Sequence, residues 1–300
     1  WQYVLFLKES FFGYEDIPKM LPLHYFILAK LNVIIPNKDF VRLFFILLSL
    51  LVPILFYLNL KLKFPQINKN LLLFFTSTIL LFPTFRSSAI WANGHITAFI
   101  FFLAAIFFYL RWKRSEKLNI NLDLILQIFF LSLSVYTRQY YAIFFIYYLI
   151  IYFQKLALLD FFKICAYIFF LTLPGFWLIY TFPHYLIGSS FTHKFYNTIL
   201  INSSMMSFYL IPLFFPLLLE PKNFFISNIK FFIVVIAVAF SMVLILSNQF
   251  DYNPSIGGGF FLKLSNLIFG NNILFYFTSL IGLVFLSFLC KDSKNNLILI

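Results

Sequence analysis

Charged side chains are scarce in this 300-residue sequence: they make up 11% of the residues, and Asp and Glu together number 10. Hydrophobic residues account for 62%, and the mean hydropathy is +0.93. This composition excludes a water-soluble globular domain, because too few polar side chains remain to cover its surface. The chain is therefore predicted to be an all-α, polytopic membrane protein, since helices satisfy their own backbone hydrogen bonds in lipid.

Cysteine and recognisable catalytic motifs are also nearly absent. Cys165 and Cys290 lie far apart in apolar runs, which indicates neither a disulfide framework nor a Cys-x-x-Cys metal site. No GxxxxGK[ST], HExxH or GxSxG pattern occurs, so nothing favours an ATPase, a zinc protease or an α/β-hydrolase. We expect no metal and no other cofactor.

Basic residues dominate the few charges, with 22 Lys and Arg and a net charge of +12. They sit in short loops between apolar runs and not on one continuous face, which argues against a nucleic-acid partner. This distribution is typical of topology signals in membrane proteins.

Apolar runs of roughly 20 residues cross a bilayer as helices, and shorter runs cross where neighbouring protein shortens the path. The sequence predicts nine spans within one transmembrane domain over 1–300, at 43–60, 71–85, 88–110, 122–136, 140–154, 164–182, 205–219, 231–248 and 270–290.

Alternate connections between these runs hold more than half of the basic residues, namely Lys61, Lys63, Lys69, Arg111, Lys113, Arg114, Lys117, Lys155, Lys163, Lys222, Lys230, Lys291 and Lys294. The positive-inside rule places these connections in the cytoplasm. The other set is then external, at 1–42, 86–87, 137–139, 183–204 and 249–269.

The external first loop, 1–42, contains a short apolar stretch at Leu21–Ile35 that we expect to lie along the membrane surface as an interfacial helix. Because the first predicted span starts on the external side, we also expect a further span upstream of Trp1.

Residues 122–154 form one long apolar stretch that contains Arg138. An arginine at the centre of a lipid-exposed helix costs a few kcal/mol. A tight external turn at Thr137–Gln139 between two short helices avoids this cost. The alternative is a single tilted helix with Arg138 buried against a backbone carbonyl or a carboxylate.

The predicted external side contains few groups able to do chemistry. Glu15 and Asp16 are candidate general bases, because a partly buried carboxylate deprotonates an acceptor hydroxyl, although a solvated turn also explains them. Arg138 and Arg86 are candidate phosphate ligands, since a guanidinium binds phosphate in bidentate fashion. Their alternative role is snorkelling to lipid headgroups.

The chain also resembles a known family at several short motifs. The run Tyr14–Tyr25 has the length of a Trp-Asp-Pro-x-x-Thr-Thr-x-Pro-x-x-Tyr segment and keeps its acid, proline and tyrosine at Glu15, Pro22 and Tyr25. Leu81-Phe82-Pro83 matches a Leu-Phe-Pro that opens a span, Arg138-Gln139 matches the start of Arg-Gln-Thr-Asn, and Gly188–His193 resembles Gly-Asp-x-x-Ser-His without the acid.

These motifs are similar to those of the C-superfamily glycosyltransferases, which use polyprenyl-phosphate sugars. Within it, the chain most resembles the alpha-1,2-glucosyltransferases that add the terminal glucose to the dolichol-linked oligosaccharide. His95 stands where that family has an aspartate, and the family's leading acidic pair would fall upstream of Trp1.

The resemblance implies an inverting sugar transfer from a polyprenyl-phosphate donor to a lipid-linked glycan, or to a similar or protein acceptor. Glu15 and Asp16 would be catalytic. Arg138, Gln139 and Arg86 would bind the donor phosphate, and His24, His95 and His193 would bind the acceptor or sugar. The reaction would occur on the non-cytoplasmic face of a bacterial inner membrane or the endoplasmic reticulum, among membrane lipids.

Two other classes stay open. A lipid or solute transporter, or a polysaccharide flippase, would place polar residues at mid-membrane in repeated halves, and the predicted spans contain few such residues. An O-antigen polymerase or ligase would gather its arginines in one large late external loop, whereas the long external segment here is the first.

Overall fold

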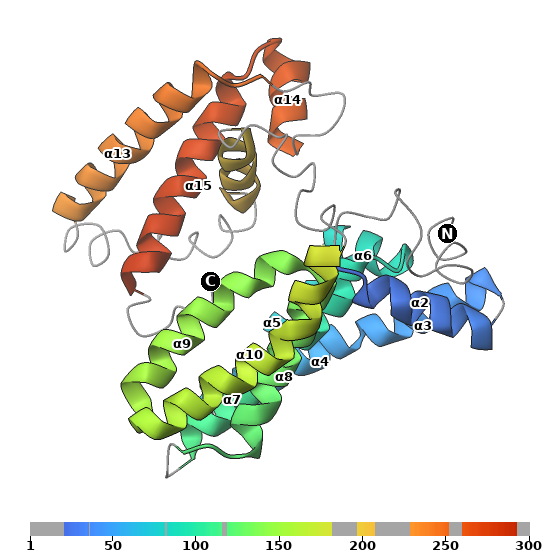
Figure 1. Ribbon diagram of the computed structural model, residues 1–300. Coiled ribbons are helices and arrows are strands. Elements are labelled where there is room, and N and C mark those ends of the chain that lie inside the picture. Colours follow the sequence, from blue (N-terminus) through green and yellow to red (C-terminus); the bar gives the residue numbers. More distant parts are fainter. Residues whose placement is uncertain are drawn as a thin grey trace. The chain divides into compact units, whose positions relative to one another are not determined.

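The computed structural model describes residues 21–35, 37–81, 83–115, 119–181, 197–207, 229–251 and 260–292. Within these ranges every regular element is a helix and no strand occurs, which confirms the predicted all-α class. The chain divides into two compact units, Trp1–Gly188 and Ser189–Ile300 (Figure 1). The prediction of one transmembrane domain over 1–300 stays a prediction.

The described helices of the first unit follow one another with short connections. They are α2 (Leu23–Ile34), α3 (Lys38–Ser49), α4 (Leu51–Lys63), α5 (Lys69–Ser77), the 3₁₀ turn η1 (Thr78–Leu81), α6 (Pro83–Ile90), α7 (Gly94–Arg114), α8 (Leu122–Thr137), the 3₁₀ turn η2 (Gln139–Ala142), α9 (Ile143–Lys155) and α10 (Leu158–Thr181). The second unit contains a helix at 197–207, α13 (Ile229–Ser247), α14 (Phe260–Phe269) and α15 (Ile273–Asp292).

Four helices in the described part of the chain are long and apolar enough to cross a membrane: Asp39–Lys63, Gly94–Arg114, Leu158–Thr181 and Lys230–Ser247. Apolar helices also overlap the predicted runs 122–136, 140–154 and 270–290, where α8, α9 and α15 lie. The predicted run 71–85 is shorter in the structure, because η1 ends at Leu81 and α6 begins at Pro83. Most of 205–219 lies outside the described residues.

Helix α7 forms the core of the first unit and packs against α8 and α4. Buried polar side chains join these helices: Ser134 on α8 donates a hydrogen bond to the Ala98 carbonyl (3.0 Å), and Asn59 on α4 donates one to the Leu103 carbonyl (2.9 Å). Such bonds hold apolar helices in register, since lipid offers no competing partner.

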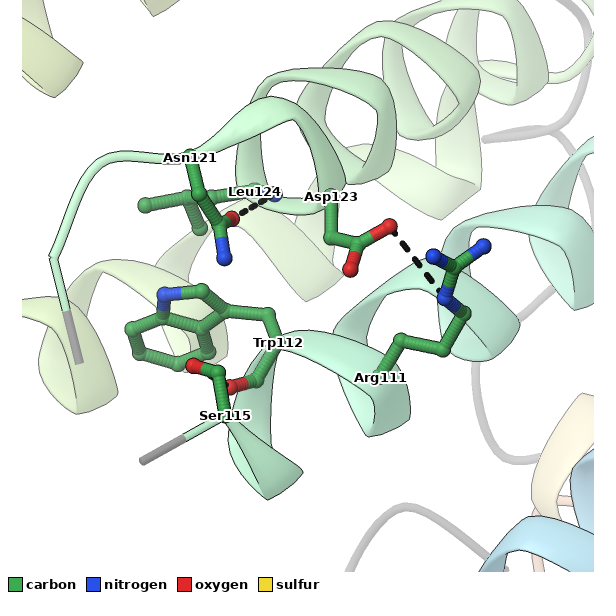
Figure 2. Close-up of polar contacts among 6 residues, drawn as sticks. All are labelled: Arg111, Trp112, Ser115, Asn121, Asp123 and Leu124. Carbon is green, nitrogen blue, oxygen red and sulfur yellow. Dashed lines mark hydrogen bonds and ion pairs between the residues drawn. The ribbon is translucent and has the colours of Figure 1, made fainter. Parts of the chain in front are cut away.

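The two ends of α7 have different chemistry. At its C-terminal end, Arg111 pairs with Asp123 of α8 at 3.4 Å, and Asn121 caps α8 by accepting a hydrogen bond from the Leu124 backbone N–H (3.0 Å) (Figure 2). Its 21 residues span about 30 Å, the thickness of a bilayer core. The N-terminal end, near His95, lies about 24 Å along the helix axis from Arg111.

Proline explains the interruption between α3 and α4. Pro53 has no N–H to donate to the carbonyl of Ser49, which is the last residue of α3. The two helices together still form the 25-residue candidate span Asp39–Lys63. The interruption is thus a bend within one apolar segment and not the end of a span.

A tyrosine is inserted into the backbone hydrogen bonds of α10. The Tyr136 hydroxyl, at the end of α8, donates to the Leu171 carbonyl (2.5 Å) and accepts from the Gly175 N–H (3.0 Å), two groups that pair directly in a regular helix. Pro174 lies inside α10, where it removes another such bond, and Gly175 leaves room for the ring, because a Cβ there would lie 3.2 Å from Tyr136 Cε1.

In the second unit, small residues bring α15 close to the helix at 197–207. A Cβ on Gly282 would collide with the Ser203 carbonyl oxygen. Ser279 donates a hydrogen bond to the Leu200 carbonyl (2.9 Å), and the Ser204 and Thr278 hydroxyls are 3.0 Å apart. Close approach through small and hydroxyl side chains is typical of helix pairs in membranes.

Tyr136→Phe tests the bridge to α10. Removing the hydroxyl deletes two hydrogen bonds between α8 and α10. Part of this loss is recovered when the Gly175 N–H bonds directly to the Leu171 carbonyl. We therefore expect the free energy of unfolding to fall by about 1 kcal/mol. Denaturant unfolding in detergent measures it. Tyr180→Phe is the control, because Tyr180 lies on α10 but is 89% exposed, and it should leave stability unchanged. Equal stability of the two variants would contradict the bridge.

Candidate functional site

A tight turn joins α6 to α7 and shapes the polar end of the first unit. The Asn93 N–H donates to the Ser88 carbonyl (2.9 Å), and the Ala92 N–H donates to the Ala89 carbonyl (3.3 Å). This bond pair is the Schellman ending of a helix, which usually places glycine in the left-handed conformation. Here that residue is Ala92, with φ of +49°, so the turn carries strain that neighbouring contacts must offset.

His24 on α2 supplies one such contact. Its Nε2 donates to the Ala92 carbonyl (2.8 Å), because a carbonyl oxygen only accepts, and Nδ1 then accepts from the Thr97 hydroxyl (3.0 Å). The ring is 2% exposed. Gly94 makes this approach possible, since a Cβ there would lie 3.2 Å from the imidazole carbons.

Burial lowers the pKa of His24 from 6.5 to about 4, against the effect of the hydrogen bond to Ala92, which raises it. The charge of Arg138 and the proximity of His95 lower this pKa further. His24 is therefore neutral near pH 7, so that Nδ1 carries no proton and accepts from the Thr97 hydroxyl.

Arg138 is the cation at the centre of the cluster. Helix α8 ends at Thr137, Arg138 is extended (φ −147°, ψ 107°), and η2 begins at Gln139. The predicted break at Thr137–Gln139 is confirmed, and the alternative of a single helix through 122–154 is wrong, because the extended residue interrupts the helical hydrogen bonds. The Arg138 side chain is 6% exposed.

Asn93 connects Arg138 to α7. Its Oδ1 accepts a hydrogen bond from Arg138 Nη2 (2.7 Å) and one from the His95 backbone N–H (3.3 Å). The second bond caps α7 at its N-terminus. One amide oxygen thus joins two segments that are 45 residues apart in the sequence.

His95 and Tyr140 form the exposed part of the cluster. His95 Nδ1 and the Tyr140 hydroxyl are 3.0 Å apart, and the rings stack with centroids 6.4 Å apart and an angle of 28° between their planes. Tyr140 is 56% exposed. An exposed imidazole and an exposed phenol thus lie close enough to the buried guanidinium to feel its charge.

The structure brings His24, His95 and Arg138 together, with Gln139 half-buried at the start of η2. Arg86 lies exposed on α6 and makes no hydrogen bond or ion pair with the described residues. Both ring nitrogens of His24 are used within the protein, so a ligand would have to displace Thr97 or Ala92 to bind it. The predicted site residues Glu15, Asp16 and His193 lie outside the described residues.

Sequence reasoning singled out neither Asn93 nor Tyr140 as a site residue. Asn93 carries a local signal, because asparagine directly before an apolar helix is typical of an N-cap. Its contact with Arg138 has no local signal, since it depends on how α7 and α8 pack.

The chemistry of this cluster suits an anion. Arg138 supplies a guanidinium, and burial keeps His24 beside it neutral near pH 7. In the described part of the chain, no group of three His, Cys, Asp or Glu side chains is placed to hold a metal ion. A guanidinium, an imidazole and a phenol are hydrogen-bonding groups that recognise phosphate and hydroxyl oxygens.

Comparisons of the chain with protein-family models, with curated proteins and with solved structures gave no match. The resemblance to C-superfamily glycosyltransferases therefore depends on the short motifs alone.

His24 predicts a pH dependence of stability. The folded-state pKa is below the unfolded value, so the unfolded chain binds more protons between about pH 4 and 6.5. The contribution of His24 to the free energy of unfolding is fully present above about pH 6.5 and is lost as the pH falls toward 4. The slope is at most about 1.4 kcal/mol per pH unit.

Thermal unfolding in detergent between pH 4.5 and 7.5 measures this slope. His24→Gln keeps an N–H donor for the Ala92 carbonyl but does not titrate, so its curve should be flatter than that of the wild type. Parallel curves for the two proteins would show that His24 does not cause the pH dependence.

Proposed function

We propose that this protein is an integral-membrane inverting glycosyltransferase that uses a polyprenyl-phosphate sugar as donor and a lipid-linked glycan or similar molecule as acceptor. The observation that supports it most directly is the buried Arg138 guanidinium, held by Asn93 at a helix break beside His95 and Tyr140.

A buried arginine in an apolar bundle is expensive to desolvate, which makes it a candidate for function. A lipid-linked phosphate suits such a group: it is anionic, it lies at the membrane surface, and its oxygens match the planar fork of a guanidinium. Arg138 occupies the end of α8 and α7 that is opposite to the Arg111–Asp123 pair, and we infer that this end lies at the membrane surface.

In the proposed reaction, a carboxylate of the first loop, Glu15 or Asp16, deprotonates the acceptor hydroxyl as the oxygen attacks the anomeric carbon. The bond from that carbon to the phosphate oxygen breaks, and the polyprenyl phosphate leaves with the electron pair. Arg138 stabilises the charge that develops on this phosphate, with Gln139 and Arg86 as further donors. His95 and His193 contact the hydroxyl groups of the sugar or acceptor, and His24 supports the turn behind them.

The proposed topology has nine spans, with residues 1–42 external. The four long apolar helices support it, as do shorter apolar helices at Lys69–Leu81, Leu122–Thr137 and Ile273–Ser287. The active site would then face the non-cytoplasmic side of a bacterial inner membrane or of the endoplasmic reticulum.

Single-cysteine labelling tests this topology. Ser115→Cys lies at the basic end of α7 and should be protected from an impermeant thiol reagent in intact cells or sealed vesicles. Ser190→Cys lies in a predicted external loop and should react, on a background in which Cys165 and Cys290 are replaced by serine. Labelling of both positions from the same side would contradict the nine-span topology.

Arg138→Lys tests the catalytic proposal. Lysine keeps the charge and the apolar stem but lacks the planar fork, so transfer should fall about a hundredfold, or roughly 3 kcal/mol of transition-state stabilisation. The assay follows labelled hexose from polyprenyl-phosphate glucose or mannose into lipid-extractable glycan in membranes that contain the protein.

Arg86→Lys is the matched control, because Arg86 is exposed on α6, and its effect should be smaller. Both variants must insert in the membrane at wild-type levels. Near wild-type transfer by Arg138→Lys would refute the phosphate role. Uptake or flipping of the lipid-linked sugar without transfer would favour a transporter or flippase instead.

A further inference from the structure

We propose that Asn93 is a positioning residue: it orients the Arg138 guanidinium toward the phosphate of the ligand and, as a neutral amide, does so without cancelling its charge. This inference rests on the proposed function, because it concerns the same phosphate.

The contact geometry sets the orientation of the guanidinium plane. The N–H bonds of a guanidinium lie in fixed directions within one plane, so a short hydrogen bond to one nitrogen constrains the whole group. Arg138 Nη2 lies 2.7 Å from Asn93 Oδ1, a distance typical of a charge-assisted bond. Arg138 has an extended backbone and lies between α8 and η2, so it belongs to no helix that would fix the direction of its side chain.

Asn93 is itself held firmly. Its backbone N–H bonds to Ser88, its Oδ1 caps α7, and the preceding carbonyl, of Ala92, accepts from His24. The strained φ of Ala92 persists because these contacts hold the residues before and after it in place. The acceptor that faces Arg138 therefore belongs to a rigid turn, as a positioning group requires.

Helix capping alone does not account for Asn93. Asparagines also cap α3, α5 and α8, through the backbone N–H groups of Asp39, Asn70 and Leu124. The cap of α7 has an additional partner, a buried guanidinium 45 residues away. The second contact is what distinguishes this cap from the other three.

The neutral amide has a chemical consequence. An aspartate at position 93 would cap α7 equally well and would also accept from Arg138. It would place a negative charge against the guanidinium, however, and would compete with an incoming phosphate for the positive charge. An amide acceptor orients the guanidinium and adds no negative charge of its own.

Three variants separate these effects. Asn93→Ser keeps the cap but is too short to hold Arg138, and Asn93→Asp keeps both contacts but adds a charge. Asn121→Ser is the matched control, because Asn121 caps α8 at the opposite end of the bundle and serine preserves a cap (Figure 2).

The first measurement does not depend on activity. Phenylglyoxal modifies accessible guanidinium groups, and peptide mass spectrometry gives its rate at Arg138 in the purified full chain. We expect Asn93→Ser to raise this rate several-fold. The rates of Asn93→Asp and Asn121→Ser should be equal to that of the wild type or lower. Undecaprenyl phosphate should protect Arg138 in the wild type and less strongly in Asn93→Asp.

The second measurement is transfer from polyprenyl-phosphate hexose. Asn93→Ser should lower kcat/KM about tenfold, the loss expected for one misplaced charge-assisted hydrogen bond. Asn93→Asp should mainly raise the KM for the donor, with a smaller change in kcat. In this variant the Arg138 guanidinium keeps its orientation, but the aspartate partly neutralises its charge. Asn121→Ser should resemble the wild type.

An unchanged phenylglyoxal rate in Asn93→Ser would overturn the positioning role and leave Asn93 as a helix cap. Full transfer by Asn93→Asp, with an unchanged KM, would overturn the argument from the neutral amide. If the phenylglyoxal rates change as expected but wild-type protein transfers no sugar from any polyprenyl-phosphate hexose, the orientation of Arg138 by Asn93 is supported and the proposed function fails.

Discussion

The first unit depends on one constraint: a guanidinium must be kept, nearly buried, at the end of a bundle made of apolar helices. Removing a guanidinium from water is costly, so the surrounding structure has to supply hydrogen-bond acceptors for Arg138. Asn93 does so from the adjacent turn, and the end of α8 at Thr137 removes Arg138 from the helical surface that faces lipid. The α6–α7 turn, the cap of α7 and the helix break are parts of this one solution.

The irregularities of the helices have individual causes. Pro53 bends the segment formed by α3 and α4, and Pro174 with the inserted Tyr136 hydroxyl modifies α10. Ala92 takes a conformation usual for glycine, because the His24 and Ser88 contacts determine it. In a membrane interior each freed backbone group needs a partner from the protein, so the irregularities occur where a side chain provides it.

The two ends of α7 are chemically distinct. The end with Arg111 and Asp123 has a partly exposed ion pair and a helix cap, which contribute little beyond local stability and orientation in the membrane. The end with His24, Asn93 and Arg138 has buried polar groups joined by hydrogen bonds. Buried and connected polar groups are costly to keep, and this cost is the physical reason to look for function at the second end.

The sequence by itself determined the class of the protein and the positions of most helices. Its composition required helices in an apolar environment, and the cost of Arg138 in a continuous span predicted the break that the structure contains at Thr137–Gln139. These inferences succeed because hydrophobic run length and the desolvation of a single charge are local properties.

Only the tertiary structure decided what surrounds Arg138. The contacts of His24 with Ala92 and of Arg138 with Asn93 join residues 68 and 45 positions apart, and no spacing in the sequence indicates them. A glycine rule would assign the left-handed turn residue to Gly94, but that glycine begins α7 and leaves room for His24, while Ala92 adopts the positive φ. The physical reason is that side-chain hydrogen bonds and close packing depend on how helices meet, which hydrophobic periodicity does not specify.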